Sequence, residues 1–179
     1  MLAAVVATPD DGTVTLTGQL SRQTHPWLAG HAVHGTVIVP GTGLVELALR
    51  AGREVGATGI EELTLEAPMV IPETGTLAVQ VNVGEPDEHG RRSVRIHSRP
   101  EGGEWRRHAA GFLAESDTPG AELTEWPPPA AQPLDVADAY DELADRGYAY
   151  GETFQALKAA WRRGEEVYAE VALPEDADT

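Results

Sequence analysis

The hydrophobic positions in the first two thirds of the chain recur at every second residue. The clearest run is Leu77, Val79, Val81 and Val83, which alternates with polar or small residues. A period of two is typical of half-buried antiparallel strands. The pattern predicts strands at 14–20, 63–65, 77–83, 94–96 and 105–113, with turns at 72–75, 84–90 and 100–103.

One segment follows the helical period instead. Leu44, Leu47, Ala48, Ala51 and Val55 share one helical face, so the spacing predicts a helix over residues 44–55, closed by Gly56. A helix and a sheet each have an apolar face that needs a partner. A single mostly apolar helix among four or five antiparallel strands therefore predicts an α+β fold, with the sheet wrapped around a buried helix.

The periodic pattern stops in a segment rich in proline, residues 116–134. Consecutive prolines favour an extended conformation and cannot join the middle of a sheet, so this segment is predicted to be a semi-rigid linker. After it, the pattern predicts a short acidic helix over 136–144 and two strands over 154–162 and 166–173. We expect a first domain at 1–115, the linker at 116–134, and the start of a second domain at 135–179.

Composition narrows the function. The chain has 179 residues, 41% of them hydrophobic, with a formal net charge of −16 and no cysteine. The acidic balance disfavours nucleic acid and anionic membranes, because binding to either depends on Lys and Arg. Disulfides and cysteine chemistry are excluded. No apolar run reaches the roughly 18 residues of a membrane span, and no signal peptide is evident, so a cytoplasmic location is expected.

The few basic residues nevertheless cluster. Arginines gather at 91–99 and at 106–107, and further basic residues lie at 158–163. A local cationic face of this kind can receive an acidic protein, although an ordinary solvated strand edge gives the same pattern. We expect Arg91 and Arg92 to be docking points under the first interpretation.

The densest group of chemically useful residues lies just before the predicted helix, where His25, His31 and His34 fall within ten residues. Histidine is a base that works near neutral pH. The Pro40–Gly41 step stands at the helix N-terminus, where unpaired backbone N–H groups can stabilise negative charge. A base beside such amides suits removal of a proton α to a carbonyl, because the enolate oxygen needs stabilisation.

Spacing alone leaves two other interpretations of these histidines open. They can ligate a metal, although no carboxylate falls among them and the His31–His34 spacing is not that of a zinc-binding helix. They can also be structural, with a ring nitrogen bonded to a backbone carbonyl. For His89, His97 and His108, structural or solvated roles are expected.

The stretch HAVHGTVIVP resembles the HxxxGxxxxP signature of dehydratase domains of modular polyketide synthases, with His31, Gly35 and Pro40 at the signature positions. The flanking HPWL and PGT steps also fit. The resemblance continues through LVELALRAGREVG, LTLEAPMVIPETG, HSRPEGGEWRRHAAGFLA and GYAYGETFQALKAAWRRGEEVYAEVALPE. It covers nearly the whole chain, and the combination is highly specific.

The resemblance implies a double hotdog fold, of which this chain would be the first half and an incomplete second half. That family eliminates water from a 3-hydroxyacyl thioester, held on the phosphopantetheine of an acyl carrier protein, to give a 2-enoyl thioester. No cofactor would be bound directly. By position, His31 matches the histidine that removes the α proton. Gly41 would offer its N–H to the thioester carbonyl, Gly35 would let the chain pass close to the substrate, and Tyr150 would lie near the substrate hydroxyl.

Two departures from the family pattern stand out. Glu152 replaces the usual proline of the GYxYGPxFQ segment. The aspartate of a DxxxQ or DxxxH motif, which would protonate the leaving hydroxyl, has no counterpart, since no aspartate here has Gln or His four residues later. Loss of a general acid costs on the order of 10²- to 10⁴-fold in rate. The acid is therefore expected from a C-terminal hotdog half outside these residues.

Three functions follow from the sequence. The preferred one is the dehydratase, working with an acyl carrier protein and other polyketide synthase domains. A second is a non-catalytic hotdog module for binding or dimerisation. A third is an isomerase that shifts the double bond of enoyl thioesters with His31 alone. The sequence leaves the oligomeric state open, a homodimer included.

Overall fold

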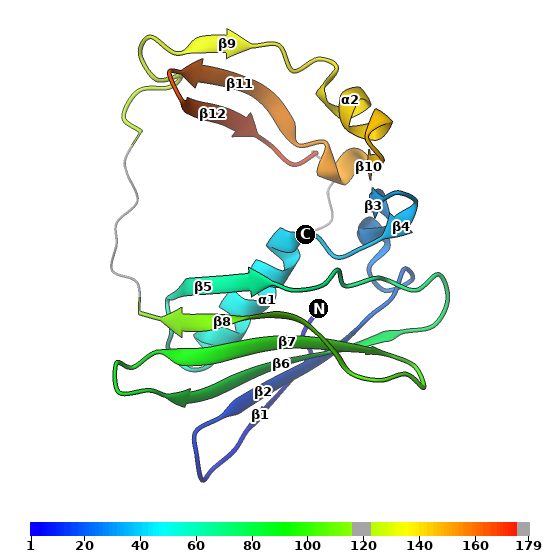
Figure 1. The fold of residues 1–179 in the computed structure, drawn as a ribbon, viewed down its shortest axis with the longest axis vertical. Coiled ribbons are helices and arrows are strands. Elements are labelled where there is room, and N and C mark those ends of the chain that lie inside the picture. The colour runs from blue at the N-terminus through cyan, green and yellow to red at the C-terminus, as the bar shows by residue number, and fades with distance from the viewer. Residues whose placement is uncertain (116–122, 175–179) are drawn as a thin grey trace. The chain divides into compact units, whose positions relative to one another are not determined.

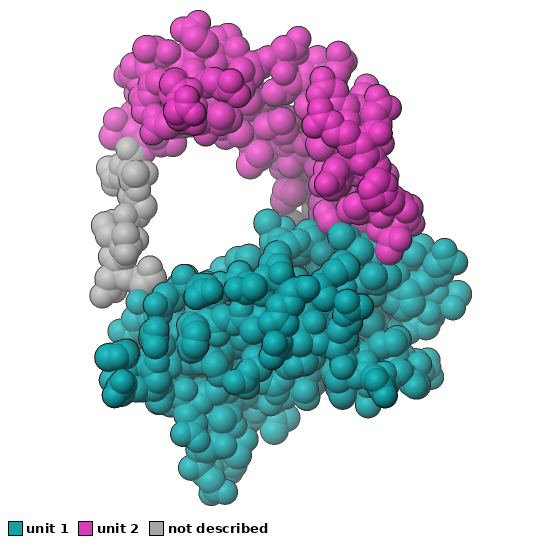
Figure 2. All heavy atoms as spheres, in the orientation of Figure 1, with its two compact units in different colours: residues 1–28, 37–117 teal, residues 29–36, 118–179 magenta. Residues whose placement is uncertain are grey.

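The computed structural model describes residues 1–115 and 123–174. The chain divides into two compact units, which Figure 2 shows in different colours. Unit 1 comprises residues 1–28 and 37–117, and unit 2 comprises residues 29–36 and 118–179. The segment 29–36, which carries His31 and His34, thus belongs to unit 2, although it lies before residue 115 in the sequence.

Unit 1 is built on a six-stranded antiparallel sheet with the strand order β1-β2-β6-β7-β8-β5 (Figure 1). Every strand predicted for the first two thirds of the chain is present in it, and β1 is additional. The bounds are β1 Ala4–Ala7, β2 Val14–Leu20, β5 Gly59–Leu65, β6 Leu77–Pro86, β7 Arg92–Pro100 and β8 Arg106–Ala114.

Alternate residues of the central strands form the core face of this sheet. Val81 of β6 lies opposite Ile96 of β7, and Val83 lies opposite Val94. All four side chains are buried. Full burial of such a side chain contributes roughly 1.5–3 kcal/mol. A shift of one residue in register would turn them all to the other face, so the apolar pattern fixes the pairing.

Helix α1, Gly41–Arg53, packs on that face through Leu44, Leu47 and Ala48, which are buried. Figure 1 shows it lying against the sheet. The helix starts three residues before the predicted Leu44 and ends ahead of Gly56, whose φ is +77°. A residue with positive φ commonly ends a helix. The predicted α+β fold, a sheet wrapped around a buried helix, is confirmed as the hotdog arrangement.

Unit 2 holds shorter elements. One three-stranded sheet has the order β10-β3-β4 and another has the order β12-β11-β9. The 3-10 helix η1, Pro26–Gly30, and β4, Thr36–Val37, cross the boundary between the units. The remaining bounds are β3 His31–Val33, β9 Gln132–Leu134, α2 Ala139–Asp145, β10 Tyr148–Tyr150, η2 Glu152–Phe154, β11 Leu157–Arg163 and β12 Glu166–Val171.

Three features differ from the sequence predictions. Gln132–Leu134, at the end of the expected linker, form β9, and Pro133 is accommodated because β9 is an edge strand. The strand predicted from residue 154 begins at Leu157, after the turn η2. The paired strands β3 and β10, far apart in sequence, have three residues each, too few to show a period. Pro119 lies outside the described residues.

Among residues 1–115 and 123–174, no helix is long and apolar enough to cross a membrane.

Unit 1 buries one polar pair, Ser98 of β7 and His108 of β8, which are 3% and 2% exposed. The His108 Nε2 lies 2.7 Å from the Ser98 hydroxyl, and its Nδ1 lies 3.1 Å from the carbonyl oxygen of Ala67. A neutral ring fits this arrangement, with Nδ1–H donating to Ala67 and Nε2 accepting from Ser98. Burial lowers the pKa of His108 below the usual range of histidine.

We predict that this pair makes the protein less stable in mild acid. The unfolded chain takes up a proton at His108 near the ordinary pKa of about 6.5, whereas the folded chain resists protonation. The stability from neutral His108 is therefore complete above that pH and is lost as the pH falls through the lowered pKa. Urea unfolding between about pH 8 and pH 5 should show this slope, and His108→Asn should reduce it. An unchanged slope in His108→Asn would contradict the assignment.

Candidate functional site

The structure brings His31 and Tyr150 together. They lie directly opposite each other in the antiparallel pair formed by β3 and β10. Their ring centroids are 5.3 Å apart, with the ring planes inclined at 36°. Cross-strand neighbours project from the same face of a sheet, so this contact follows from the register. The two residues are far apart in sequence, and only long-range pairing unites them.

A second ring, that of Phe154, lies 5.1 Å from the His31 ring. Phe154 closes the one-turn helix η2, which folds the chain back after β10. The His31 ring is thereby half-buried between two aromatic side chains. Phe154 was not predicted as a site residue, although it stands in the GYxYGPxFQ-like segment that contains Tyr150.

Tyr150 is itself held by its surroundings. The ring of Tyr140, on α2, meets it edge-on at 6.3 Å, and the ring of Tyr148 stacks at 6.4 Å. The backbone N–H of Leu157 donates to the Tyr140 hydroxyl at 2.8 Å, which ties α2 to the start of β11. Gln155 Nε2 donates to the Tyr150 carbonyl oxygen at 2.7 Å. These contacts restrict movement of the Tyr150 ring away from His31.

The two glycines proposed from the sequence have separate explanations in the fold. Gly35 has φ +77°, and a Cβ there would meet open space, so the positive φ of the β3–β4 turn accounts for glycine at this position. Gly41 is the first residue of α1. The amides of Gly43 and Leu44 donate to the Pro40 carbonyl oxygen. The N–H of Gly41 belongs to the first turn, where helix geometry supplies no acceptor.

 The other histidines have different settings. His25 is half-buried, and its Nδ1 lies 2.8 Å from the Thr24 hydroxyl. His97 is also half-buried, and burial lowers the pKa of both rings. His89 is exposed in the turn between β6 and β7. Within the described ranges, no group of three His, Asp or Glu side chains is placed to hold a metal ion.

The aspartates that follow the proline-rich segment are exposed. The Asp135 carboxylate accepts the Ala137 N–H at 3.0 Å, and Asp138 stands at the N-terminus of α2. Asp141 and Asp145 lie on α2 and are exposed to solvent. These aspartates therefore lie at or next to α2 and face solvent.

A cavity of about 540 Å³ lies beside the β3–β10 pair within unit 2. Small residues of the two strands, including Ala32 and Ala149, form one wall, and α2 contributes Tyr140 and Asp141. Ala32 pairs with Ala149, next to the His31–Tyr150 pair. Tyr150, whose ring contacts His31, also lines this cavity, whereas His31 itself does not.

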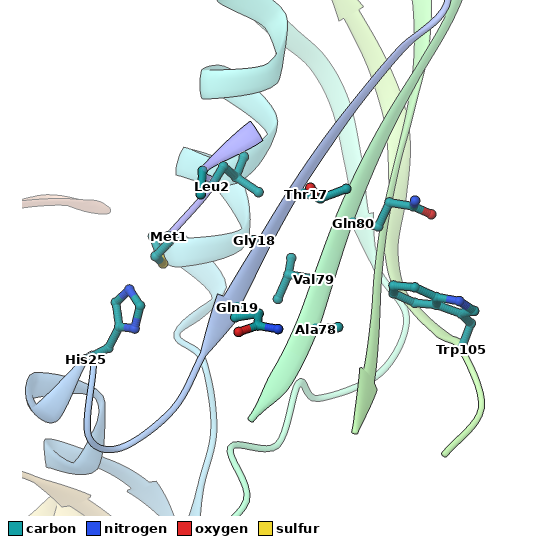
Figure 3. Close-up of a pocket in the computed structure, with 11 residues that line it drawn as sticks. Met1, Leu2, Thr17, Gly18, Gln19, His25, Ala78, Val79, Gln80 and Trp105 are labelled. Carbon is teal, nitrogen blue, oxygen red and sulfur yellow. The ribbon is translucent and has the colours of Figure 1, made fainter. Parts of the chain in front are cut away.

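A different pocket, of about 560 Å³, lies in unit 1 at the end of β2. Figure 3 shows Met1, Leu2 and His25 on one side of β2 and Trp105 on the other side of the sheet. None of the four residues proposed from the sequence lines this pocket. Its size alone does not make it the candidate site.

The arginines expected to dock a partner are engaged within unit 1. Arg91 pairs with Asp87 at 2.9 Å and with Glu61 at 3.5 Å. Arg92 donates to the carbonyl oxygens of Gly12 and Gly84 at 3.0 and 2.9 Å. Charge reversal at these two positions would disturb the β6–β7 hairpin, so it cannot serve as a clean test of docking.

Two families match the chain. Residues 1–99 match the family described as polyketide synthase dehydratase domain, and residues 118–179 match the polyketide synthase dehydratase N-terminal domain. The chain is 55% identical over 97% of its length to polyketide synthase GfsA of Streptomyces halstedii. It is 54% identical over 99% of its length to mycoketide-CoA synthase of Mycobacterium tuberculosis. It spans 2% and 4% of the length of these two proteins.

Solved structures agree in fold. The dehydratase domain from the terminal module of the rifamycin polyketide synthase is 50% identical, with a TM-score of 0.92, covering 98% of this chain and 67% of that one. The erythromycin dehydratase is 42% identical, with a TM-score of 0.91, covering 98% and 66%. An inactive mutant of CurK dehydratase with His replaced by Phe is 26% identical, with a TM-score of 0.85, covering 98% and 64%. Another, with Asp replaced by Asn, is 26% identical, with a TM-score of 0.83, covering 96% and 63%.

The sequence matches and the fold agree along both units, from the signature around His31 to the segment around Tyr150. The chain therefore belongs to the polyketide synthase dehydratase family.

Proposed function

We propose that this chain supplies the general base of a dehydratase acting on a 3-hydroxyacyl thioester carried by an acyl carrier protein. The observation that carries the proposal is the packing of the His31 ring against Tyr150 and Phe154. Membership of the dehydratase family supports the reaction class. The inactive His-to-Phe mutant of CurK dehydratase supports the need for a histidine in that class.

In the first step, His31 takes the proton from C2 of the acyl group. The electron pair of the C–H bond moves toward the thioester carbonyl, whose oxygen gains negative charge. The N–H of Gly41, at the start of α1, donates a hydrogen bond to that oxygen. Histidine suits this role because it exchanges protons near neutral pH.

In the second step, the C2–C3 double bond forms as the C3–O bond breaks, and the hydroxyl takes a proton to leave as water. Tyr150 orients that hydroxyl. The proton donor is an aspartate outside these 179 residues, because no aspartate of the chain has the motif spacing. Two observations support this assignment: the inactive Asp-to-Asn mutant of CurK dehydratase, and the 66–67% of the rifamycin and erythromycin domains that the chain spans.

The first test follows the half-reaction that needs only the base. In D₂O, the protein should catalyse deuterium uptake at C2 of a 3-hydroxybutyryl pantetheine thioester, measured by NMR. His31→Ala should slow this exchange by about 10²-fold or more, since a general base typically contributes that much. His89→Ala is the matched control, because His89 is exposed in a turn of unit 1 and should leave exchange unchanged.

The same assay separates the alternatives. Exchange that survives in His31→Ala would contradict the assignment of the base. The isomerase would be indicated if the chain moves the double bond between 2-enoyl and 3-enoyl thioesters. It would then neither remove nor add water, even after an acid-bearing half is added. Complete inertness of the wild-type chain, alone and with that half, would indicate the non-catalytic module.

A second test concerns Tyr150. Tyr150→Phe keeps the ring that packs on His31 and Tyr140 but removes the hydroxyl. Exchange at C2 of the 3-hydroxyacyl thioester should fall by about tenfold, the value of one hydrogen bond of about 1.4 kcal/mol. Exchange of the matched butyryl thioester, which lacks the hydroxyl, should stay the same. An equal loss of exchange rate on both substrates would show that the Tyr150 hydroxyl does not act on the substrate hydroxyl.

A further inference from the structure

The turn that follows His31 contains a conformation that side chains rarely adopt. His34 and Gly35 join β3 to β4, and their φ angles are +47° and +77°. Positive φ at both central residues is the mark of a type I′ turn, in which Asn-Gly and Gly-Gly are preferred. Histidine at the first position carries some strain. The strained turn lies at the end of β3, the strand that bears His31.

The His34 side chain lies over Gly147. The two residues continue the β3–β10 pairing, and the His34 N–H donates to the Gly147 carbonyl oxygen at 2.7 Å. A Cβ placed on Gly147 would lie 2.3 Å from Nδ1 and 2.4 Å from Cε1 of the His34 ring. Gly147 also has φ +89°. The positive φ favours glycine at this position, and a side chain there would have to displace the His34 ring.

The backbones of the two strands are also close at the other end of the β3–β10 pairing. The Gly151 N–H donates to the Gly30 carbonyl oxygen at 2.7 Å, and a Cβ on Gly151 would lie 3.0 Å from the Gly30 Cα. The His31–Tyr150 pair lies between these two ends. The backbones of β3 and β10 are therefore fixed on both sides of the ring contact that the proposed reaction uses.

We propose that His34 is a positioning residue, which holds β3 in register on β10 through Gly147 and so keeps the His31 ring against Tyr150. This inference rests on the proposed function for its catalytic consequence. His34 is exposed, and it lies in the turn that follows β3. It acts through the strand pairing and not by touching the substrate.

Three variants separate positioning from simple folding. His34→Asn keeps a side chain that tolerates the turn and removes the imidazole from Gly147. Gly147→Ala forces a Cβ into the space that the ring occupies. Gly164→Ala is the matched control, because Gly164 has φ +60° in the β11–β12 turn and a Cβ there would meet open space. Both alanine variants carry backbone strain, but only Gly147→Ala also collides with His34.

The readouts are the nuclear Overhauser effect between the His31 and Tyr150 rings, and kcat and KM for C2 deuterium exchange by the full chain. His34→Asn should weaken the ring-to-ring effect and lower kcat by about tenfold, with KM unchanged, since a misplacement of about 1 Å can cost about 10²-fold in rate. Gly147→Ala should lower the ring-to-ring effect and kcat further. Gly164→Ala should leave both as in the wild type.

The inference is overturned if His34→Asn keeps the wild-type ring contact and kcat, or if Gly164→Ala changes them as much as Gly147→Ala. If Gly147→Ala does not fold, the double variant His34→Gly/Gly147→Ala decides, because removal of the ring should restore folding and reveal coupling between the positions. If the wild-type chain shows no exchange, the proposed function fails, and the ring contact still tests the positioning role.

Discussion

The pairing of β3 with β10 is the constraint on which the candidate site depends. It places His31 opposite Tyr150, although the two residues come from opposite ends of the sequence. Their contact exists only in the folded chain, and it needs Phe154 and Tyr140 to keep both rings in place. A short strand pair of three residues has little stability alone, so its close glycine contacts are important for a defined geometry.

The scaffold of unit 1 rests on simpler physics. The alternating valines of β6 and β7 and the apolar face of α1 bury each other, which fixes the sheet register and the axis of the helix. The start of α1 follows from Pro40, whose carbonyl oxygen accepts the first helical hydrogen bonds. The position of the Gly41 amide thus depends on packing along the whole helix.

Long periodic segments made most of unit 1 predictable, because burial on one face leaves a period of two in β6 and a helical period in α1. Unit 2 was less predictable. Strands of three residues such as β3 and β10 show no period. β9 was predicted to be part of the linker because it contains Pro133. The clustered histidines marked the region, but the choice of His31 among them, and of Tyr150, came from the resemblance to a family. The contacts of Phe154 and His34 depend on pairing that no local pattern reveals.

In the proposed reaction, the His31 ring takes the proton from C2 of a bound acyl group. A crystal structure of the chain with an unreactive 3-hydroxyacyl pantetheine amide would locate both groups. A His31 ring nitrogen is expected about 3–3.5 Å from C2, the separation of groups poised to react. A ligand whose C2 lies far from this ring, or a ring sealed from it by packed side chains, would contradict the account.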